Sequence, residues 1–408
     1  MTQHRIAYLV SQYPAYSHTF ILREVVQLRQ FGVEILVASI NLPDRPFDKL
    51  TDIERQEAEQ TFYIKQQGIA KAVSVLMKIL LLNPVGLFRG IKHAIKLGGW
   101  NIKMVLYHFF YLAEALLVGD WMQAQNVKHI HVHFATPAAS VGMLVKTVFG
   151  YGFSITVHGS DEFYNISGYN LPEKIIAADF LFCISHYTRS QIMKWAPLKA
   201  WAGFDVCRLG VDPQRFIPSV KSQANETCQI LCIGRLLLAK GQSIILDSVA
   251  QLKQQGVLVH LTLVGTGPDQ QTLINYAESL GISSQVTFTG AVDQDNILPY
   301  YNQADMFVLP SFAEGIPVVL MEAMAMAIPC ITSRITGIPE LIQDGENGIL
   351  VPASDSEGFT QAIKRLAENQ ALRQQLGEAG RATILSDYDL NKNTRYFYEK
   401  LAQRLDAL

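Results

Sequence analysis

The stretch that decides the fold is QILCIGRLLLAKGQSIILDSVAQLKQQGVLVHLTLVGTG, residues 229–267. It contains an apolar run that ends at Gly234, a helical pattern that ends at Gly256, and a second apolar run. Two short apolar strands separated by a helix are typical of a βαβ unit, because parallel strands need a long crossover connection. The stretch therefore predicts a doubly wound α/β domain of the Rossmann-like kind.

The same alternation continues on both sides of this stretch. Further strands are predicted at VTFTGA, MFVLP and PCITS downstream, and at RIAYLVS, VEILVASI, HIHVHFA, FSITVH and FLFCIS upstream. We therefore expect two tandem Rossmann-like domains, residues 1–218 and 228–385, joined by the polar linker 219–227. A terminal helix within residues 386–408 is expected to pack back on the first domain. Two such domains form a cleft, and ligands bind there at the carboxyl ends of the strands.

The composition excludes several classes of protein. Of the 408 residues, 49% are hydrophobic and 17% charged, which is enough apolar material for two cores. A net charge of −2 argues against a nucleic-acid binder. We find no secretory signal and no uninterrupted apolar run of membrane-spanning length, so we expect a cytoplasmic protein. The five cysteines show no C-x-x-C spacing and are expected to be reduced core residues.

Residues 60–118 differ from the rest of the first domain and are expected to be a helical insertion. No Asp or Glu occurs between residues 60 and 113, whereas this interval contains seven basic residues: Lys65, Lys71, Lys78, Arg89, Lys92, Lys96 and Lys103. Arg89, Lys92 and Lys96 share one helical face, beside apolar residues on adjoining faces. A basic, apolar helix of this kind can lie at a membrane surface. The alternative is an ordinary pair of helices packed on the sheet, with the lysines in solvent.

Two cations follow the first strand of the second domain. Arg235 and Lys240 stand between that strand and the next helix, where they could bind a diphosphate. Ala239 and Gly241 do not fit a Walker A loop, and a pair of ordinary surface cations is the alternative. Gly265, after the next strand, either allows a nucleotide to approach the backbone closely or simply forms a turn.

Histidines lie in or at the end of predicted strands of the first domain. His158 is predicted at a strand end, where it is either a structural residue or part of a ligand site. His129, His131 and His133 alternate along one predicted strand and so share a face. A zinc site is conceivable there, but no partner ligand has suitable spacing, and we favour burial or a place lining the cleft.

The segment EGIPVVLMEAMA, residues 314–325, places Glu314 just before a helix and Glu322 inside it. An acidic residue near a helix start complements the helix dipole, which is the simplest explanation of Glu314. Alternatively, both carboxylates bind hydroxyl groups of a polar ligand.

Together with Arg235 and Lys240, this segment resembles the signature of family 4 glycosyltransferases, which have the GT-B fold of two Rossmann-like domains. TVHGSDEF, CISHYTRSQI, RLGVDPQRFIP, LVGTGP and ADMFVLPS support the resemblance in the expected order. The likeness covers nearly the whole chain except the insertion. The opening SQYPAYSHTFILREV, residues 11–25, is similar to the branch that builds exopolysaccharides such as colanic acid.

The resemblance implies retaining transfer of a hexose from a nucleoside-diphosphate sugar, without a metal ion or other cofactor. It implies that Arg235 and Lys240 bind the diphosphate and that Glu322 accepts hydrogen bonds from the ribose diol. It further implies that Glu314 and the backbone of Gly315 and Ile316 contact the sugar. His158 would lie near the sugar and the leaving phosphate, and Gly265 near the nucleotide.

We therefore expect a glycosyltransferase that acts on a hydroxyl of a glycan or lipid-linked acceptor, with peripheral membrane contact through the insertion and no nucleic-acid partner. One departure concerns the acceptor: many family members carry a glycine-rich loop where this chain has Ser17, His18 and Thr19. Two alternatives remain open. One is a sugar-nucleotide epimerase or phosphorylase of the same fold, and the other a non-catalytic nucleotide-sugar-binding scaffold.

Overall fold

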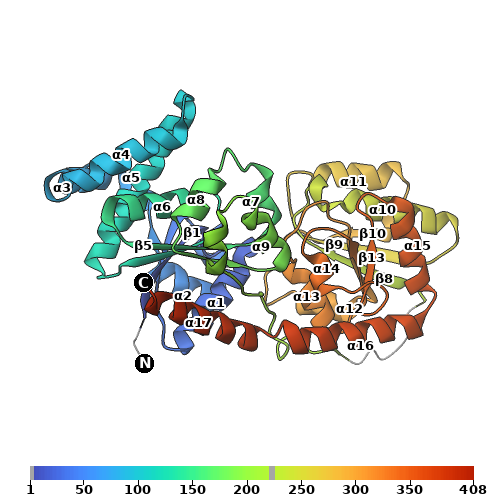
Figure 1. Ribbon diagram of the computed structural model, residues 1–408. Coiled ribbons are helices and arrows are strands. Elements are labelled where there is room, and N and C mark those ends of the chain that lie inside the picture. Colours follow the sequence, from blue (N-terminus) through green and yellow to red (C-terminus); the bar gives the residue numbers. More distant parts are fainter. Residues whose placement is uncertain (1–3, 220–225) are drawn as a thin grey trace. The chain divides into compact units, whose positions relative to one another are not determined.

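The computed structural model describes residues 4–219 and 226–408, so most of the predicted linker 219–227 lies outside the described residues. Contacts divide the chain into two units, residues 1–207 with 394–408 and residues 208–393. Each unit is an α/β domain with one parallel sheet (Figure 1). This is the predicted pair of doubly wound domains.

The first unit has a seven-stranded sheet in the order β3-β2-β1-β4-β5-β6-β7. Every pairing in it is parallel. The strand order reverses between β1 and β4, as in the Rossmann arrangement. The strands are β1 Arg5–Gln12, β2 Glu34–Asn41, β3 Phe62–Tyr63, β4 His129–His133, β5 Gly152–Val157, β6 Phe180–Cys183 and β7 Phe204–Val206.

Helices cover both faces of this sheet, and the strand residues alternate between the faces. In β1, Ala7 and Leu9 join a core that includes residues of α5, α6 and α8. Tyr8 and Val10 join the opposite core, which includes residues of α1 and α17. The helices of the unit are α1 Thr19–Gln30, α2 Asp52–Gln60, α3 Gly68–Leu82, α4 Pro84–Gly98, α5 Ile102–Ala124, α6 Pro137–Phe149, α7 Ser160–Tyr164, α8 Leu171–Ala177, α9 His186–Met193 and α17 Leu390–Asp406.

The insertion forms three helices, α3, α4 and α5, at the edge of the unit where Figure 1 draws them in light blue to teal. The segment of α3 and α4 bends by 118° at Asn83, whose side chain accepts a hydrogen bond from the N–H of Gly86. By length and composition α5 could span a membrane, although we expected no such segment. The second half of α5 is buried in the core, with Leu112 and Met122 among its residues. This half is therefore part of the domain.

The C-terminal helix α17 lies on the first unit. Phe397 and Leu401 are buried in the same core as Tyr8 and Val10. Arg404 Nε donates to Asp205 Oδ2 at 2.8 Å, at the edge strand β7. The helix covers one face of the sheet, because the apolar side chains of β1 and β6 on that face need a partner layer.

The second unit has a six-stranded parallel sheet in the order β10-β9-β8-β11-β12-β13, which reverses between β8 and β11. Its strands are β8 Cys228–Ile233, β9 Val259–Val264, β10 Val286–Phe288, β11 Met306–Leu309, β12 Cys330–Ser333 and β13 Ile349–Val351. Its helices are α10 Gln242–Gln254, α11 Gln270–Ser279, α12 Leu298–Gln303, α13 Val318–Ala325, α14 Ile338–Leu341, α15 Ser356–Ala367 and α16 Gln370–Asp387. The stretch 229–267 forms β8, α10 and β9, as predicted.

Residues 208–218 belong to the second unit, whereas the sequence placed them in the first domain. Val211 forms a bridge with Asp389, and Arg381 donates to the carbonyl of Phe216 at 2.9 Å. The Phe216 ring packs edge-on against Tyr301, 5.8 Å between centroids. These partners lie 80 to 180 residues away in sequence, so no local pattern could locate the boundary.

Candidate active site

The predicted diphosphate and sugar residues of the second unit lie on the loops that follow β8 and β11. These two strands are neighbours at the point where the strand order reverses. In open α/β sheets the carboxyl ends of the strands at this point form the ligand-binding crevice, because their loops turn away from each other to opposite faces. Both loops also lead into helices, α10 and α13, whose N-termini favour negative charge.

Lys240 and Glu314 meet across this point. Lys240 Nζ lies 2.7 Å from Glu314 Oε1, and the Ser311 hydroxyl donates to the same oxygen at 2.7 Å. The Lys240 side chain is 26% exposed and that of Glu314 11%. The sequence placed these two residues in one site, and the structure brings them into direct contact. The carboxylate holds the ammonium group in one place while leaving part of it open to a ligand.

Arg235 lies nearby in sequence on the same loop but has no such partner. Its side chain is exposed and forms no ion pair with any described residue, and its carbonyl accepts a hydrogen bond from Gln242 Nε2 at 2.8 Å. The backbone N–H groups of Gly315 and Ile316, just before α13, also find no acceptor among the described residues. One guanidinium group and two backbone donors are thus available to an anionic or polar ligand.

Glu322 lies one turn into α13 and is buried. The Tyr301 hydroxyl donates to Glu322 Oε2 at 2.9 Å. A buried carboxylate without hydrogen-bond donors would be costly, so Tyr301 explains how the charge is accommodated. Glu322 and Glu314 come from the same β11–α13 segment, as the sequence indicated.

Gly265 is required by the backbone itself. It has a φ of +137°, and a Cβ atom on it would lie 2.0 Å from the carbonyl oxygen of Gly234. The loops after β8 and β9 therefore touch each other at these two glycines. The close approach that the sequence assigned to a nucleotide is, in this structure, an approach of one loop to the other.

His158 follows β5 in the first unit, and its ring is held on several sides. It lies between the rings of Phe20 and Phe134, with centroid distances of 4.9 Å and 4.4 Å. Its Nε2 lies 3.1 Å from His133 Nδ1. Burial, with His133 and His18 nearby, lowers the pKa of His158 well below its usual value. The ring is therefore neutral near pH 7.

Two buried ionisable residues connect the loops after β4 and β5. Glu162 accepts hydrogen bonds from the N–H groups of Ala135, His158 and Gly159 at 2.6 to 2.7 Å. Lys174 Nζ donates to the carbonyls of Ala135 and Thr136 at 2.9 and 2.7 Å. Burial lowers the pKa of Lys174 to about 7. Neither residue was expected from the sequence. Both Lys174 bonds and the Glu162 bond to Ala135 reach backbone that is distant along the chain.

The alternating histidines of β4 form a polar ladder with β5. His129 Nε2 and His131 Nδ1 both bond to the Ser154 hydroxyl, at 2.7 and 2.8 Å, and His131 Nε2 bonds to that of Thr156 at 2.8 Å. No group of three metal-ligating side chains occurs in residues 4–219 and 226–408. His129 Nε2, both nitrogens of His131 and His133 Nδ1 thus bond to hydroxyls or another histidine. His129 Nδ1 and His133 Nε2 are buried without a hydrogen bond among the described residues.

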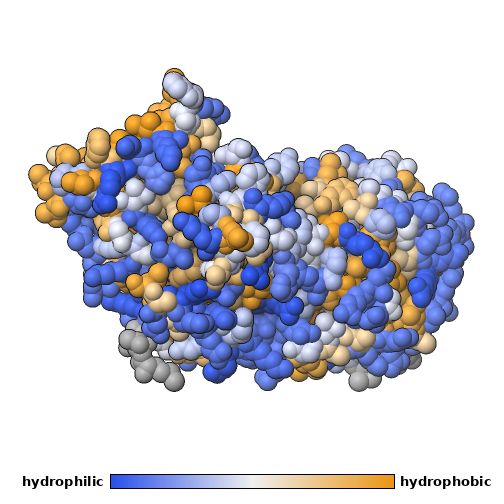
Figure 2. All heavy atoms as spheres, in the orientation of Figure 1, coloured by the Kyte–Doolittle hydropathy of each residue, from blue (hydrophilic) through white to orange (hydrophobic). Residues whose placement is uncertain are grey.

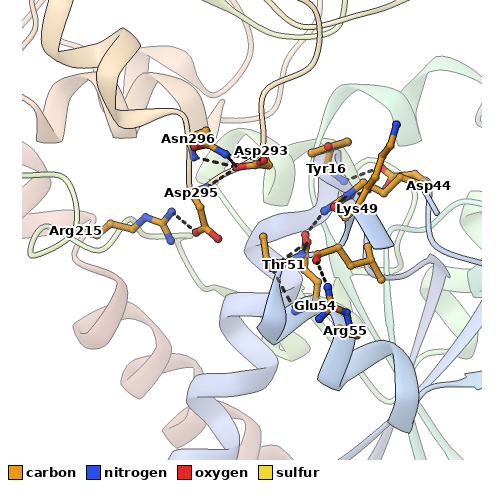
Figure 3. Close-up of polar contacts among 12 residues, drawn as sticks. Tyr16, Asp44, Lys49, Thr51, Glu54, Arg55, Arg215, Asp293, Asp295 and Asn296 are labelled. Atoms are coloured by element: carbon orange, nitrogen blue, oxygen red, sulfur yellow. Dashed lines mark hydrogen bonds and ion pairs between the residues drawn. The ribbon is translucent and has the colours of Figure 1, made fainter. Parts of the chain in front are cut away.

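The loop after β1 differs from a glycine-rich loop, as the sequence indicated. The N–H of Tyr16 donates to Asp44 Oδ2 at 2.7 Å (Figure 3). The guanidinium group of Arg45 lies over the Tyr16 ring. The N-cap residue of α1 is His18, which makes no capping bond. His18 Nδ1 lies 3.3 Å from the carbonyl of Gln12 instead. The loop is thus held by a carboxylate and ring contacts.

In the second unit, the loop after β10 has a polar network of its own. Arg215 Nη2 lies 3.2 Å from Asp295 Oδ1, and Asp293 accepts hydrogen bonds from the backbone N–H groups of Asp295 and Asn296 (Figure 3). This network holds the segment before α12, the helix that provides Tyr301.

Sequence reasoning did not identify Ser311 and Tyr301. Ser311 lies three residues before Glu314 and directly after β11, so its spacing could have indicated it. Tyr301 lies 21 residues before Glu322 on another helix, and only the fold brings the two together.

Comparisons with known proteins agree with this geometry. Residues 214–383 match the family described as glycosyl transferases group 1. Over 99% of its length the chain is 26% identical to the amylovoran biosynthesis glycosyltransferase AmsK of Erwinia amylovora, covering 100% of that protein. It is 24% identical to the putative colanic acid biosynthesis glycosyltransferase WcaL of Escherichia coli, with 89% of this chain and 91% of that protein covered.

Solved structures share the fold. The sucrose-phosphate synthase of Thermosynechococcus elongatus aligns with a TM-score of 0.76 at 18% identity, covering 100% of both chains. Anabaena HepE, solved in complex with UDP and glucose, aligns with a TM-score of 0.74 at 17% identity, covering 98% of this chain and 100% of that one. With its two parallel-sheet domains the chain has the GT-B fold of these glycosyltransferases, and its residues 214–383 carry a domain of the family glycosyl transferases group 1.

Proposed function

We propose that this chain transfers a hexose, with retention of configuration, from a nucleoside-diphosphate sugar to a hydroxyl group of a glycan or lipid-linked acceptor. The product belongs to a surface polysaccharide or glycoconjugate. The observation that carries the proposal is the contact of Lys240 with Glu314 across the reversal point of the second sheet. Arg235, on the same loop as Lys240, forms no ion pair with any described residue. The kinship with exopolysaccharide glycosyltransferases supports the class of product.

In this proposal the two cations stabilise the leaving diphosphate. Negative charge grows on that group as its bond to the sugar breaks, and Lys240 and Arg235 supply positive charge where a metal ion would otherwise be needed. No side chain has to act as a nucleophile. The departing phosphate accepts the proton of the incoming hydroxyl on the same face of the sugar, which retains the configuration.

The remaining groups recognise the hydroxyls of the donor. Glu314 and the free N–H groups of Gly315 and Ile316 contact the sugar. Glu322 accepts hydrogen bonds from the ribose diol, since one carboxylate can accept two such bonds at once. The hydroxyl of Tyr301 keeps Glu322 in place when no donor is bound.

A panel of nucleotide sugars tests the proposal. A ligand present at 100 times its dissociation constant adds about 2.7 kcal/mol to the free energy of unfolding. We expect one nucleoside-diphosphate hexose to raise the melting temperature of the wild-type chain with a chelator present, and to do so less in Lys240→Ala. With that donor and a lipid extract, the nucleoside diphosphate should be released and a glycolipid formed, as detected by mass spectrometry.

Other outcomes identify the alternatives. An isomerised sugar nucleotide without acceptor would indicate an epimerase, and sugar phosphate formed from inorganic phosphate would indicate a phosphorylase. Stabilisation without any turnover would indicate a binding scaffold. Loss of stabilisation on adding the chelator would contradict metal-free binding.

We further propose that the enzyme works at the cytoplasmic surface of a membrane through the insertion. Hydrophobic residues gather over α3 and α4 (Figure 2). Ile69 and Leu81 on α3 are 84% and 76% exposed, Phe88 on α4 is 68% exposed, and Trp100 after α4 is fully exposed. A group of neighbouring apolar side chains that face water usually marks an interaction site.

The charge beside these apolar residues indicates a lipid surface with acidic headgroups. Arg89, Lys92 and Lys96 on α4 are exposed and form no ion pair with a described residue. We expected no acidic residue to neutralise the basic residues of this region. Asp120 on α5 nevertheless pairs with Lys78, with Lys78 Nζ 2.6 Å from Asp120 Oδ1. The unneutralised charge is therefore concentrated on α4.

Vesicle sedimentation tests this contact. Each Arg or Lys near an anionic surface contributes about 1 kcal/mol, so the triple variant Arg89→Gln/Lys92→Gln/Lys96→Gln should bind anionic vesicles on the order of 100-fold more weakly. Phe88→Ser with Trp100→Ser should weaken binding to both anionic and neutral vesicles, because it removes inserted apolar area.

The control for the charge is Lys194→Gln/Lys199→Gln/Lys253→Gln, which makes the same change in net charge at exposed sites outside the insertion. It should bind vesicles like the wild type. Equal binding by all these variants would reject the membrane contact. A concentration-dependent dimer that the apolar variant abolishes would assign the surface to a second copy instead.

A further inference from the structure

The turn that ends at Lys240 is tied to a neighbouring loop by one carboxylate. Asp269, in the loop after β9, accepts a hydrogen bond at Oδ2 from the backbone N–H of Leu238, at 2.8 Å. Leu238 begins the short 3₁₀ turn Leu238–Lys240 between β8 and α10. Leu238 is 47% exposed, so burial of its side chain does little to hold the turn in place. The Asp269 carboxylate therefore anchors the start of the turn whose last residue is Lys240.

The position of Asp269 in the sequence predicts a different role. It is the N-cap residue of α11, where an aspartate side chain usually accepts a hydrogen bond from the first turn of its own helix. Here the side chain makes no such capping bond and binds a loop 31 residues away. The helix thus lacks a local stabilising contact that its sequence offers. A local preference that is overridden in this way is often found at a functional site.

The backbone of the loop after β9 adds two further bonds to the loop after β8. The N–H of Leu236 donates to the carbonyl of Thr266 at 2.9 Å, and the N–H of Asp269 donates to the carbonyl of Leu236 at 3.2 Å. A Cβ atom on Gly267 would lie 2.0 Å from that carbonyl oxygen, so a side chain there would push the two loops apart. Residues 265–269 therefore support the loop that carries both cations of the candidate site.

Both cations take their direction from the backbone of this supported loop. Arg235 is exposed and forms no ion pair with a described residue, so no carboxylate aims its guanidinium group. Lys240 closes the turn, and its N–H donates to the carbonyl of Leu237 at 2.7 Å. A shift of the turn would displace the Lys240 ammonium group from its contact with Glu314. A misplacement of about 1 Å near a reacting group can lower a rate on the order of 100-fold.

We infer that Asp269 is a positioning residue for the diphosphate site, which holds the turn Leu238–Lys240 so that Lys240 and Arg235 face the leaving diphosphate together. This inference rests on the proposed function and deepens it, because it assigns the loop 265–269 a role in that site. A carboxylate repels a diphosphate, so Asp269 acts through the backbone of Leu238 and not on the ligand itself.

Amide hydrogen exchange of the full-length chain tests the anchor without any ligand. Exchange is measured at single-residue resolution in the wild type and in Asp269→Ala. The N–H groups of Leu238, Lys240 and Gly241 should exchange about tenfold faster in the variant, because the first loses its acceptor and the other two are bonded within the same turn. Unchanged exchange at Leu238 would overturn the inference.

Ligand affinity separates positioning from general stability. Whichever of UDP, GDP, ADP and dTDP binds the wild type is compared with its own monophosphate by calorimetry. Asp269→Ala should bind the diphosphate about tenfold more weakly and the monophosphate within about threefold of the wild type, because the second phosphate adds the charge that the two cations bind. Equal losses for the two ligands would show a merely structural role and refute the positioning.

Asp269→Asn is the rescue variant. Its amide oxygen can still accept the hydrogen bond from the N–H of Leu238, whereas alanine cannot. We expect Asp269→Asn to restore the wild-type affinity for the diphosphate, and kcat with the donor found in the panel to fall about tenfold in Asp269→Ala alone. If the asparagine variant is as impaired as the alanine variant, the hydrogen bond to Leu238 is not the cause.

Asp305→Ala is the matched control. Asp305 precedes β11 and contacts the start of β8 in the same way: its Oδ2 accepts from the N–H of Gln229 at 2.8 Å, and its own N–H donates to the Gln229 carbonyl at 2.8 Å. These bonds lie at the amino end of β8, whereas Arg235 follows its carboxyl end. Asp305→Ala should therefore lose stability and keep both affinities. An equal loss of diphosphate affinity in this control would contradict a specific role for Asp269.

Failure of the inference differs from failure of the proposed function. If none of the four nucleoside diphosphates binds the wild type, the proposed function fails and the inference fails with it. If one of them binds the wild type and Asp269→Ala equally well, the inference alone fails and the proposed function stands.

Discussion

Replacing Lys240 by alanine should separate catalysis from stability. In the structure its ammonium group contacts Glu314 at 2.7 Å, with the two side chains 26% and 11% exposed. A partly exposed ion pair contributes about 1 kcal/mol at most, and Glu314 keeps the Ser311 hydroxyl as a donor. We therefore expect a loss of about 1 kcal/mol, which lowers the melting temperature by about 2–4 °C for a domain of this size.

The loss of turnover should be much larger. Removing one preorganised donor from a developing negative charge typically costs about 3–4 kcal/mol of transition-state stabilisation, which corresponds to a 10²- to 10³-fold lower rate. The difference arises because the ion pair with Glu314 is partly hydrated, whereas the contact with a bound diphosphate is not. Initial rates of nucleoside diphosphate release, with the donor found in the panel, measure the loss of turnover. Thermal unfolding measures the loss of stability.

Lys253→Ala is the control for this experiment. Lys253 lies near the end of α10, the helix that follows Lys240; it is exposed and donates to the carbonyl of Gly281 at 2.6 Å. It should lose a similar amount of stability and keep its turnover. A Lys240→Ala enzyme within threefold of the wild-type rate would refute the role of Lys240, and so would an equal loss of rate in Lys253→Ala.

Four further changes have expected outcomes. Glu322→Gln should raise KM for the donor by about 10- to 100-fold with a smaller effect on kcat, because a buried group matched to the ribose hydroxyls is altered; equal KM values in steady-state kinetics would contradict this. Gly265→Ala should destabilise the second unit by on the order of 3 kcal/mol in urea unfolding, since its Cβ would meet the Gly234 carbonyl at 2.0 Å and its φ is +137°. Burial lowers the folded pKa of Lys174 to about 7, so above that pH the unfolded chain binds more protons than the folded one. The free energy of unfolding of the wild type should therefore rise by up to about 1.4 kcal/mol per pH unit between pH 7 and 9. Lys174→Met should flatten this rise. Glu114→Gln should flatten the opposite slope, because burial raises the folded pKa of Glu114 to about 7 and stability falls as the pH rises from about 4.5 to 7; urea unfolding at several pH values measures both slopes.

The two α/β domains could be predicted from the sequence because their signals are local. Each strand of a buried parallel sheet is a short apolar run, and each crossover helix has its own period, so 229–267 alone identified β8, α10 and β9. The segment 314–325 placed Glu314 before a helix and Glu322 inside it for the same reason. The short edge strands β3, β7 and β13 were not predicted, since their two or three residues carry too little pattern.

The sequence by itself thus determined the class of fold, the order of its elements and the residues after β8 and β11 that form the candidate site. Only the tertiary structure decided which side chains meet: Tyr301 with Glu322, Asp120 with Lys78, and Glu24 with His133 and His158. These partners lie on different elements, 21 to 109 residues apart, and their contacts depend on which strands are neighbours and which helix covers which face. Periodicity along the chain fixes the direction in which a residue points relative to its own element, but it contains no information about what lies opposite.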